Sequence, residues 1–150
     1  MAAYEPEWLC QRIVESAPDA IILADRDGII RLWNGGAQAV FGYAAEEALG
    51  ESLDLIVPER LRERHWAGFR KAMATGVTRY GRELLAVPAI RKDATRISIE
   101  FSVALLRDPA GDVLGVAAIM RDVSERWTEQ KELRERLAAL EAQVASGEPD

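Results

Sequence analysis

The stretch 20–33, AIILADRDGIIRLW, decides the fold class of this chain. It holds two β-rich segments, 20–24 and 28–33, on either side of Asp25-Arg26-Asp27-Gly28. An Asp-Gly pair between two apolar runs favours a tight turn, so the stretch predicts a β-hairpin. Three more segments, 78–87, 95–106 and 112–121, have the composition of strands, and apolar and polar residues alternate in the second of them. The hairpin is therefore expected to belong to a larger antiparallel sheet.

Helical segments lie between and around these strands. Apolar residues recur at helical spacing in 8–17, and short helices are expected at 35–41 and 44–49. Pro58 can start a longer helix that runs to about Thr75. Two strands, several helices and three strands, without regular βαβ alternation, predict an α+β fold whose five-stranded antiparallel sheet carries helices on one face.

The domain organisation follows from the same segments. We expect an N-terminal flanking helix in residues 1–15, one α+β domain in 16–123, a C-terminal helix in 124–146 and a disordered tail in 147–150. A chain of 150 residues is long enough for one such core. No internal repeat divides the chain further.

Composition excludes several classes of protein and site. The net charge of −6 offers no basic field for nucleic acid, and the basic stretch 60–70 is interleaved with acids. Cys10 is the only cysteine, so the chain can form neither an internal disulfide nor a thiolate metal cluster. The longest apolar run, 113–120, is too short to span a bilayer, and the N-terminus lacks the pattern of a signal peptide. We therefore expect a cytoplasmic protein without direct membrane insertion.

Short motifs in a fixed order resemble the PAS family of sensor domains. The opening is similar in Ser16-Ala17-Pro18-Asp19-Ala20-Ile21-Ile22 and in 27–34, DGIIRLWN. The family's helical segment resembles 40–43, 46–50 and 56–58, and its C-terminal signature resembles 121–126, RDVSER. The resemblance covers about residues 16–126. It implies a PAS fold with an internal pocket that, in different members, holds haem, flavin, another chromophore, a metabolite or nothing.

His65, the single histidine, carries the most specific local signal. The segment 58–70, PERLRERHWAGFR, resembles the helix of haem-binding oxygen-sensor PAS domains, in which a histidine ligates the iron. The resemblance implies haem b held through His65, with Tyr80 and Arg82 on the distal side. Residues 80 and 82 share strand parity, so both side chains would lie on one face. Alternatively, His65 only caps or packs in the helix and Arg82 pairs with Glu83 or Glu100.

Other ligands and activities are alternatives to haem. A light sensor of the LOV type needs a reactive cysteine near residues 50–60, and none occurs there. FAD or FMN bound without a covalent bond remains an alternative, as does a haem-free interaction module that is empty or holds a metabolite. The sequence contains no phosphate-binding loop, nucleophile elbow or metal-spaced histidine pair. We therefore expect a sensory module that is not itself an enzyme and that acts on a separate, unidentified effector.

The C-terminal segment has the pattern of a coiled coil. Four apolar residues follow each other at 4-3-4 spacing: Leu133, Leu137, Leu140 and Val144. Such a stripe needs a partner to bury it, and we expect a homodimer through these residues.

Overall fold

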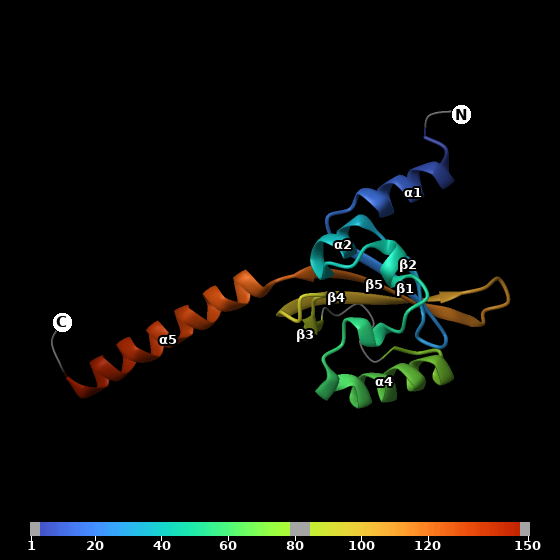
Figure 1. The fold of residues 1–150 in the computed structure, drawn as a ribbon. Coiled ribbons are helices and arrows are strands. Elements are labelled where there is room, and N and C mark those ends of the chain that lie inside the picture. The colour runs from blue at the N-terminus through green and yellow to red at the C-terminus, as the bar shows by residue number, and fades with distance from the viewer. Residues whose placement is uncertain (1–3, 79–84, 148–150) are drawn as a thin grey trace.

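The computed structural model of the protein describes residues 4–78 and 85–147. Five strands form one sheet in the order β2-β1-β5-β4-β3, and every neighbouring pair is antiparallel (Figure 1). Its strands are β1 (Ala20–Asp25), β2 (Ile30–Trp33), β3 (Leu85–Ile90), β4 (Arg96–Arg107) and β5 (Val113–Asp122). The predicted five-stranded antiparallel sheet is confirmed.

Helices precede, interrupt and follow the strands. They are α1 (Pro6–Ser16), α2 (Gly35–Phe41), α3 (Ala45–Ala48), the 3-10 turns η1 (Leu53–Leu55) and η2 (Glu59–Leu61), α4 (Arg62–Thr75) and α5 (Ser124–Ser146). In the described part of the chain, no helix is both long and apolar enough to cross a membrane.

The β1–β2 turn has the chemistry that its sequence predicts. The side chain of Asp25 accepts hydrogen bonds from the backbone N–H groups of Asp27 (2.9 Å) and Ile29 (3.1 Å). Gly28, at φ +78°, adopts the left-handed conformation that glycine tolerates best. Arg31 from β2 closes the turn with an ion pair to Asp25 at 2.8 Å.

Asn34 joins the hairpin to the first helices. Its Oδ1 caps α2 by accepting from the N–H of Ala37 (2.9 Å), and it also accepts from the N–H of Ile21 (2.8 Å). Its Nδ2 donates to the carbonyls of Val14 (2.7 Å) and Asp19 (3.1 Å). A buried amide with all these partners fixes the end of α1, the start of β1 and the start of α2 together.

The core lies on one face of the sheet. Cross-strand partners share a face, so Ile22, paired with Ala118, and Ala20, paired with Met120, point the same way, and all four are buried. Buried residues from the helical segments join this cluster: Ala37, Phe41, Ala48, Leu53 and Ile56. The predicted placement of helices on one face of the sheet is confirmed.

Several predicted element bounds needed correction. The third strand, predicted at 78–87, is β3, which runs from Leu85 to Ile90, and Thr78 lies outside it; residues 79–84 fall outside the described part of the chain. The strand continues through Pro88, which has no N–H to donate. Since β3 is an edge strand with only one neighbour, that missing donor is tolerated. The helix predicted from Pro58 begins instead with the 3-10 turn η2.

Hydrogen bonds between β4 and the base of α5 form the joint of this helix. The backbone N–H of Val123 donates to the carbonyl of Ser98 (2.8 Å), and the N–H of Ser98 donates to Oγ of Ser124 (2.9 Å). Ser124 also donates to the carboxylate of Asp122 (2.6 Å). Beyond this joint α5 runs away from the sheet, with no other element beside it in Figure 1.

Candidate functional site

Helix α4 lies against the core through one apolar side. Trp66 and Phe69 pack on the core cluster, and Met73 is buried. The helix ends at Gly76, whose left-handed backbone (φ +69°) lets its N–H reach the carbonyl of Ala72. Trp66, Phe69 and Met73 follow each other at intervals of three and four residues, so they lie on the face of α4 that packs on the core, and the other face is in solvent.

His65 lies on α4 beside these aromatic rings and is half-buried. Its ring centroid is 4.8 Å from that of Trp66 and 6.1 Å from that of Phe69. Its Nδ1 is buried and has no hydrogen-bond partner among the described residues. Burial lowers the pKa of His65 below its ordinary value, and the negative charge of Asp54 opposes that shift. The imidazole is therefore held in its neutral form near pH 7.

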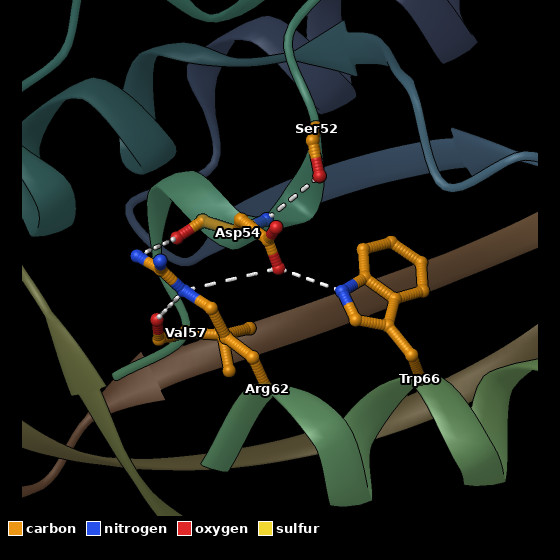
Figure 2. A network of polar contacts seen from close by, with 5 residues as sticks. All are labelled: Ser52, Asp54, Val57, Arg62 and Trp66. Atoms are coloured by element: carbon orange, nitrogen blue, oxygen red, sulfur yellow. Dashed lines mark hydrogen bonds and ion pairs between the residues drawn. The ribbon is translucent and has the colours of Figure 1, made fainter. Parts of the chain in front are cut away.

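Asp54 organises the polar network between η1 and α4, which Figure 2 shows. Its Oδ1 accepts a hydrogen bond of 2.6 Å from the indole N–H of Trp66 and lies 3.9 Å from Nε of Arg62. Arg62 also donates to the backbone carbonyls of Asp54 (3.2 Å) and Val57 (3.1 Å). The network ties the first turns of α4, on which His65 lies, to the chain segment before it.

Trp66 also contacts the β1–β2 turn. A Cβ added to Gly28 would lie 2.1 Å from the Trp66 ring, far inside any real contact distance. The absence of a side chain at Gly28 therefore makes room for the indole. One tryptophan thus connects α4 to the hairpin through packing and to η1 through a hydrogen bond.

Two arginines hold the opposite end of α4. Arg26 donates to the carbonyls of Met73 (3.3 Å) and Val113 (2.7 Å). Arg107 donates to the carbonyls of Gly76 and Gly111. Cations at a helix C-terminus satisfy its free carbonyls and complement its dipole. Both ends of α4 are consequently fixed by polar contacts.

The sheet offers apolar surface on the side of the core. Phe101 pairs with Met120, and Val103 pairs with Ala118, so these residues share the face of the buried core. Yet Phe101 and Val103 are only half-buried. Two more half-buried core-side residues extend this surface: Val87 and Val116. Apolar side chains of this kind, with a few polar groups beside them, are the usual lining of a small-molecule site.

A family model described as the PAS fold matches residues 14–128. The chain belongs to the PAS-fold family. Among curated proteins, an uncharacterized protein of Azorhizobium caulinodans is 35% identical to this PAS domain over 127 residues, which cover 84% of this chain and 17% of that protein.

Two relatives are named as sensors. Sensor protein FixL of Bradyrhizobium diazoefficiens is 29% identical over 131 residues, 85% of this chain and 25% of that protein. Oxygen sensor protein DosP of Escherichia coli is 25% identical over 122 residues, 81% of this chain and 15% of that protein. The chain thus spans a quarter or less of the length of these three relatives.

Solved structures confirm the PAS fold. The PAS domain of a protein from Colwellia psychrerythraea superposes with a TM-score of 0.71 at 21% identity, covering 81% of this chain and 99% of that one. An RNA-binding Light-Oxygen-Voltage receptor superposes with the same TM-score at 24% identity, covering 93% and 40%. At these identities the likeness establishes the fold and leaves the ligand open.

The structure places one of the three site residues predicted for this PAS domain. His65 lies at the core side of α4, next to Trp66 and Phe69. Tyr80 and Arg82 lie outside the described residues, so their predicted distal position stays a prediction. Glu100 is one of the two pairing partners considered for Arg82. Its Oε2 forms an ion pair of 2.8 Å with Nη2 of Arg126.

The residues present fit a haem held by one histidine. The fit rests on the buried, unpartnered Nδ1 of His65, the neutral state of its ring and the apolar residues of the sheet face. The described residues contain no group of three or more His, Cys, Asp or Glu side chains that could hold a metal ion by themselves. Haem carries nitrogen ligands of its own, so one histidine from the protein, His65, would be sufficient to hold it.

Sequence reasoning missed the role of Asp54. Asp54 and Trp66 are 12 positions apart in the sequence, and the 3-10 turns η1, which contains Asp54, and η2, which follows it, have no periodicity that would reveal the contact. A signal was nevertheless present, because Asp54 is the one charged residue in the otherwise apolar run 53–57. A carboxylate in such a run is partly shielded from water, so polar partners stabilise it, and here the indole and the guanidinium supply them.

Proposed function

We propose that this PAS domain binds haem b through His65 and senses a diatomic gas or a redox state. The observation that carries the proposal is the Nδ1 of His65, a buried nitrogen without a partner among the described residues, on an otherwise apolar side of α4. Buried polar atoms in proteins nearly always have partners, so an exception on this face favours a ligand site. The relative named an oxygen sensor supports the same class of function.

The protonation state of His65 supports its role as a ligand. A metal binds the neutral imidazole, and protonation would compete with it. Desolvation by the surrounding side chains lowers the pKa of His65, so the neutral form predominates at physiological pH. When bound, haem would supply reversible binding of the gas or of an electron. The protein's share is to keep the ring neutral, oriented and away from bulk water.

The residues around His65 would orient it. Trp66 is fixed by its hydrogen bond to Asp54 and by its fit over Gly28, so the turn of α4 that carries His65 has little freedom to rotate. Phe69 and the apolar sheet residues Phe101 and Val103 would exclude water from the bound group. For the distal side, Tyr80 and Arg82 remain the proposed donors.

Strand β5 gives the site a route to the C-terminal helix. Val116, Ala118 and Met120 line the core side of β5, and the same strand leads through Asp122 into α5. A change in the volume or charge of the bound group would press on these side chains and shift the balance between two packings at the base of α5. In this proposal α5 carries the output to the effector.

An absorption spectrum tests the proposal. The purified protein, mixed with haem, is expected to show a Soret band at roughly 400 nm. His65→Ala should lose this band while its far-ultraviolet circular dichroism stays close to wild type. Arg64→Ala, a change at an exposed neighbour on the same helix, is the matched control and should keep the band.

Each other result has a defined meaning. Full haem occupancy in His65→Ala would remove His65 as the required ligand. A wild-type spectrum without any Soret band after haem addition would overturn the haem proposal and favour the haem-free interaction module. A flavin spectrum in the purified protein would replace haem by FAD or FMN as the cofactor.

A further inference from the structure

A shallow cleft lies between the 3-10 turn η2 and the first residue of β4. Its volume is about 530 Å³, and four residues line it: Pro58, Glu59, Arg60 and Arg96. Pro58 is buried, whereas the three charged residues are exposed. The cleft shares no residue with the aromatic side of α4 around His65, so it is a second candidate site and not part of the first.

Two guanidinium groups from different elements line this cleft. Arg60 lies in η2, and Arg96 is the first residue of β4. Within residues 4–78 and 85–147, neither guanidinium forms an ion pair or a hydrogen bond. Arg62 differs from them, because it donates to the backbone carbonyls of Asp54 and Val57. The two cleft arginines therefore keep their donors available for a ligand.

The charge balance of the cleft favours an anion. Its lining carries two positive charges and one negative charge, that of Glu59, which forms no ion pair of 4.0 Å or less with either arginine. The whole chain has a net charge of −6 and repels anions in general. An anion that binds this protein must therefore be held by a local group of cations. Placed between two guanidiniums, it would also offset their mutual repulsion.

The geometry of the guanidinium group selects phosphate over carboxylate. One planar fork engages both oxygens of a carboxylate, which leaves little for a second fork to bind. A phosphate group presents three terminal oxygens and a charge of about −1.5 to −2, so two forks can share it. We propose that this cleft binds a phosphate group, free or carried by a small molecule, with Arg60 and Arg96 as its donors. The proposal does not depend on haem.

A bound phosphate would join two parts of the fold. The turn η2 leads directly into α4, and Arg96 lies two residues before Ser98, which holds the base of α5. A ligand shared by Arg60 and Arg96 therefore links the start of α4 to the strand that anchors α5. Because such a ligand binds only the folded chain, phosphate should raise the melting temperature in a concentration-dependent way.

Titration of the full chain with inorganic phosphate tests the site. At constant ionic strength, backbone amide NMR shifts near Arg60 and Arg96 should saturate with a dissociation constant in the millimolar range. Arg60→Ala and Arg96→Ala should each raise this constant at least about tenfold, since each removes charge-assisted donors. Arg64→Ala, at an exposed arginine on the next turn that does not line the cleft, is the matched control and should bind as wild type does.

Two further variants separate charge from geometry. Glu59→Gln removes the negative charge from the lining and should lower the dissociation constant about threefold. Arg96→Lys keeps the positive charge but loses the fork, so binding should weaken about fivefold. Wild-type affinity in Arg96→Lys would contradict bidentate recognition. All substituted side chains are exposed, so far-ultraviolet circular dichroism should stay close to wild type and confirm that each variant folds.

Other anions identify the ligand class. Succinate, a dicarboxylate, should bind at least about fivefold more weakly than phosphate, and equal binding would overturn the assignment to phosphate. Tighter binding of glycerol phosphate than of inorganic phosphate would assign a phosphate ester, and the reverse order would assign the free ion. Phosphate shifts that do not saturate, or a dissociation constant unchanged in both Arg60→Ala and Arg96→Ala, would overturn the site.

Discussion

Helices α4 and α5 of this PAS domain each carry a row of large apolar side chains, but the described chain covers only the row on α4. The apolar side of α4, with Trp66, Phe69 and Met73, packs on the core, and polar contacts hold both of its ends. The apolar side of α5 is exposed along its whole length. The comparison separates two uses of the same pattern, because a face buried within one chain stabilises the fold, whereas an uncovered face is available to another chain.

The largest expected effect is the loss of stability when Gly28, against which Trp66 of α4 packs, is replaced. Gly28→Ala should lower the free energy of unfolding by about 3 kcal/mol, since the new methyl group both strains a left-handed backbone and collides with the Trp66 ring. Gly50→Ala is the matched control, because Gly50 has a similar φ of +87° and nothing within 4 Å of an added Cβ. It should cost about 1 kcal/mol, the backbone strain alone.

Urea denaturation of both glycine variants measures the difference. The excess loss in Gly28→Ala over Gly50→Ala reports the contact between Trp66 and the β1–β2 turn. Equal losses would mean that the indole moves aside freely and does not fix α4.

Truncating one apolar side chain on each helix, which should have a smaller effect on stability, compares the two helix faces directly. Met73→Ala removes a buried side chain of α4 and should cost about 2 kcal/mol of unfolding free energy. Leu137→Ala removes an exposed side chain of α5 and should change it by less than about 0.5 kcal/mol. Both are measured by urea denaturation at the same low protein concentration. A large loss in Leu137→Ala under these conditions would show that α5 belongs to the cooperative core.

The smallest expected effect is a pH dependence of the free energy of unfolding, caused by His65 on α4. The pKa of His65 is lower in the folded chain than its ordinary value of 6.5, because burial disfavours the charged ring. The unfolded chain therefore binds the proton first as pH falls, so the free energy of unfolding should decrease from about pH 7.2 downward through 6.5. Above about pH 7.2 the contribution of the neutral His65 to the free energy of unfolding is fully present.

Substitution identifies the titrating group. His65 is the only histidine, and His65→Gln should flatten the slope that develops as the pH falls from about 7.2 through 6.5. Leu137→Ala on α5 should retain it. A slope unchanged in His65→Gln would assign the pH dependence to another group and contradict the neutral, buried imidazole.

The sequence predicts local structure well where neighbouring residues determine it. The Asp-Gly turn and the C-terminal helix at 124–146 both depend on residues within one or two turns of each other. The third strand was predicted less well, because Pro88 reads as a stop unless the edge position of β3 is known.

The site was harder to predict than the fold. His65 could be singled out because it is the only histidine and lies in a PAS-like segment, but its neutral state depends on burial that only the fold supplies. The contacts of Asp54 with Trp66 and of Gly28 with the same indole join distant segments, and no local pattern indicates them. Tyr80 and Arg82 remain predictions from resemblance.

The hydrogen-bonded joint between β4 and the base of α5 has a mechanical consequence. Val123 and Ser124 are fixed to Ser98, while the 23 residues of α5 extend freely beyond them for about 35 Å. Such a geometry is a lever with its fulcrum at the sheet. A tilt of about 5° at the fulcrum, too small to disturb the strand pairing, displaces the far end of the helix by roughly 3 Å. Small movements of β4 and β5 would therefore become displacements of roughly 3 Å at Val144.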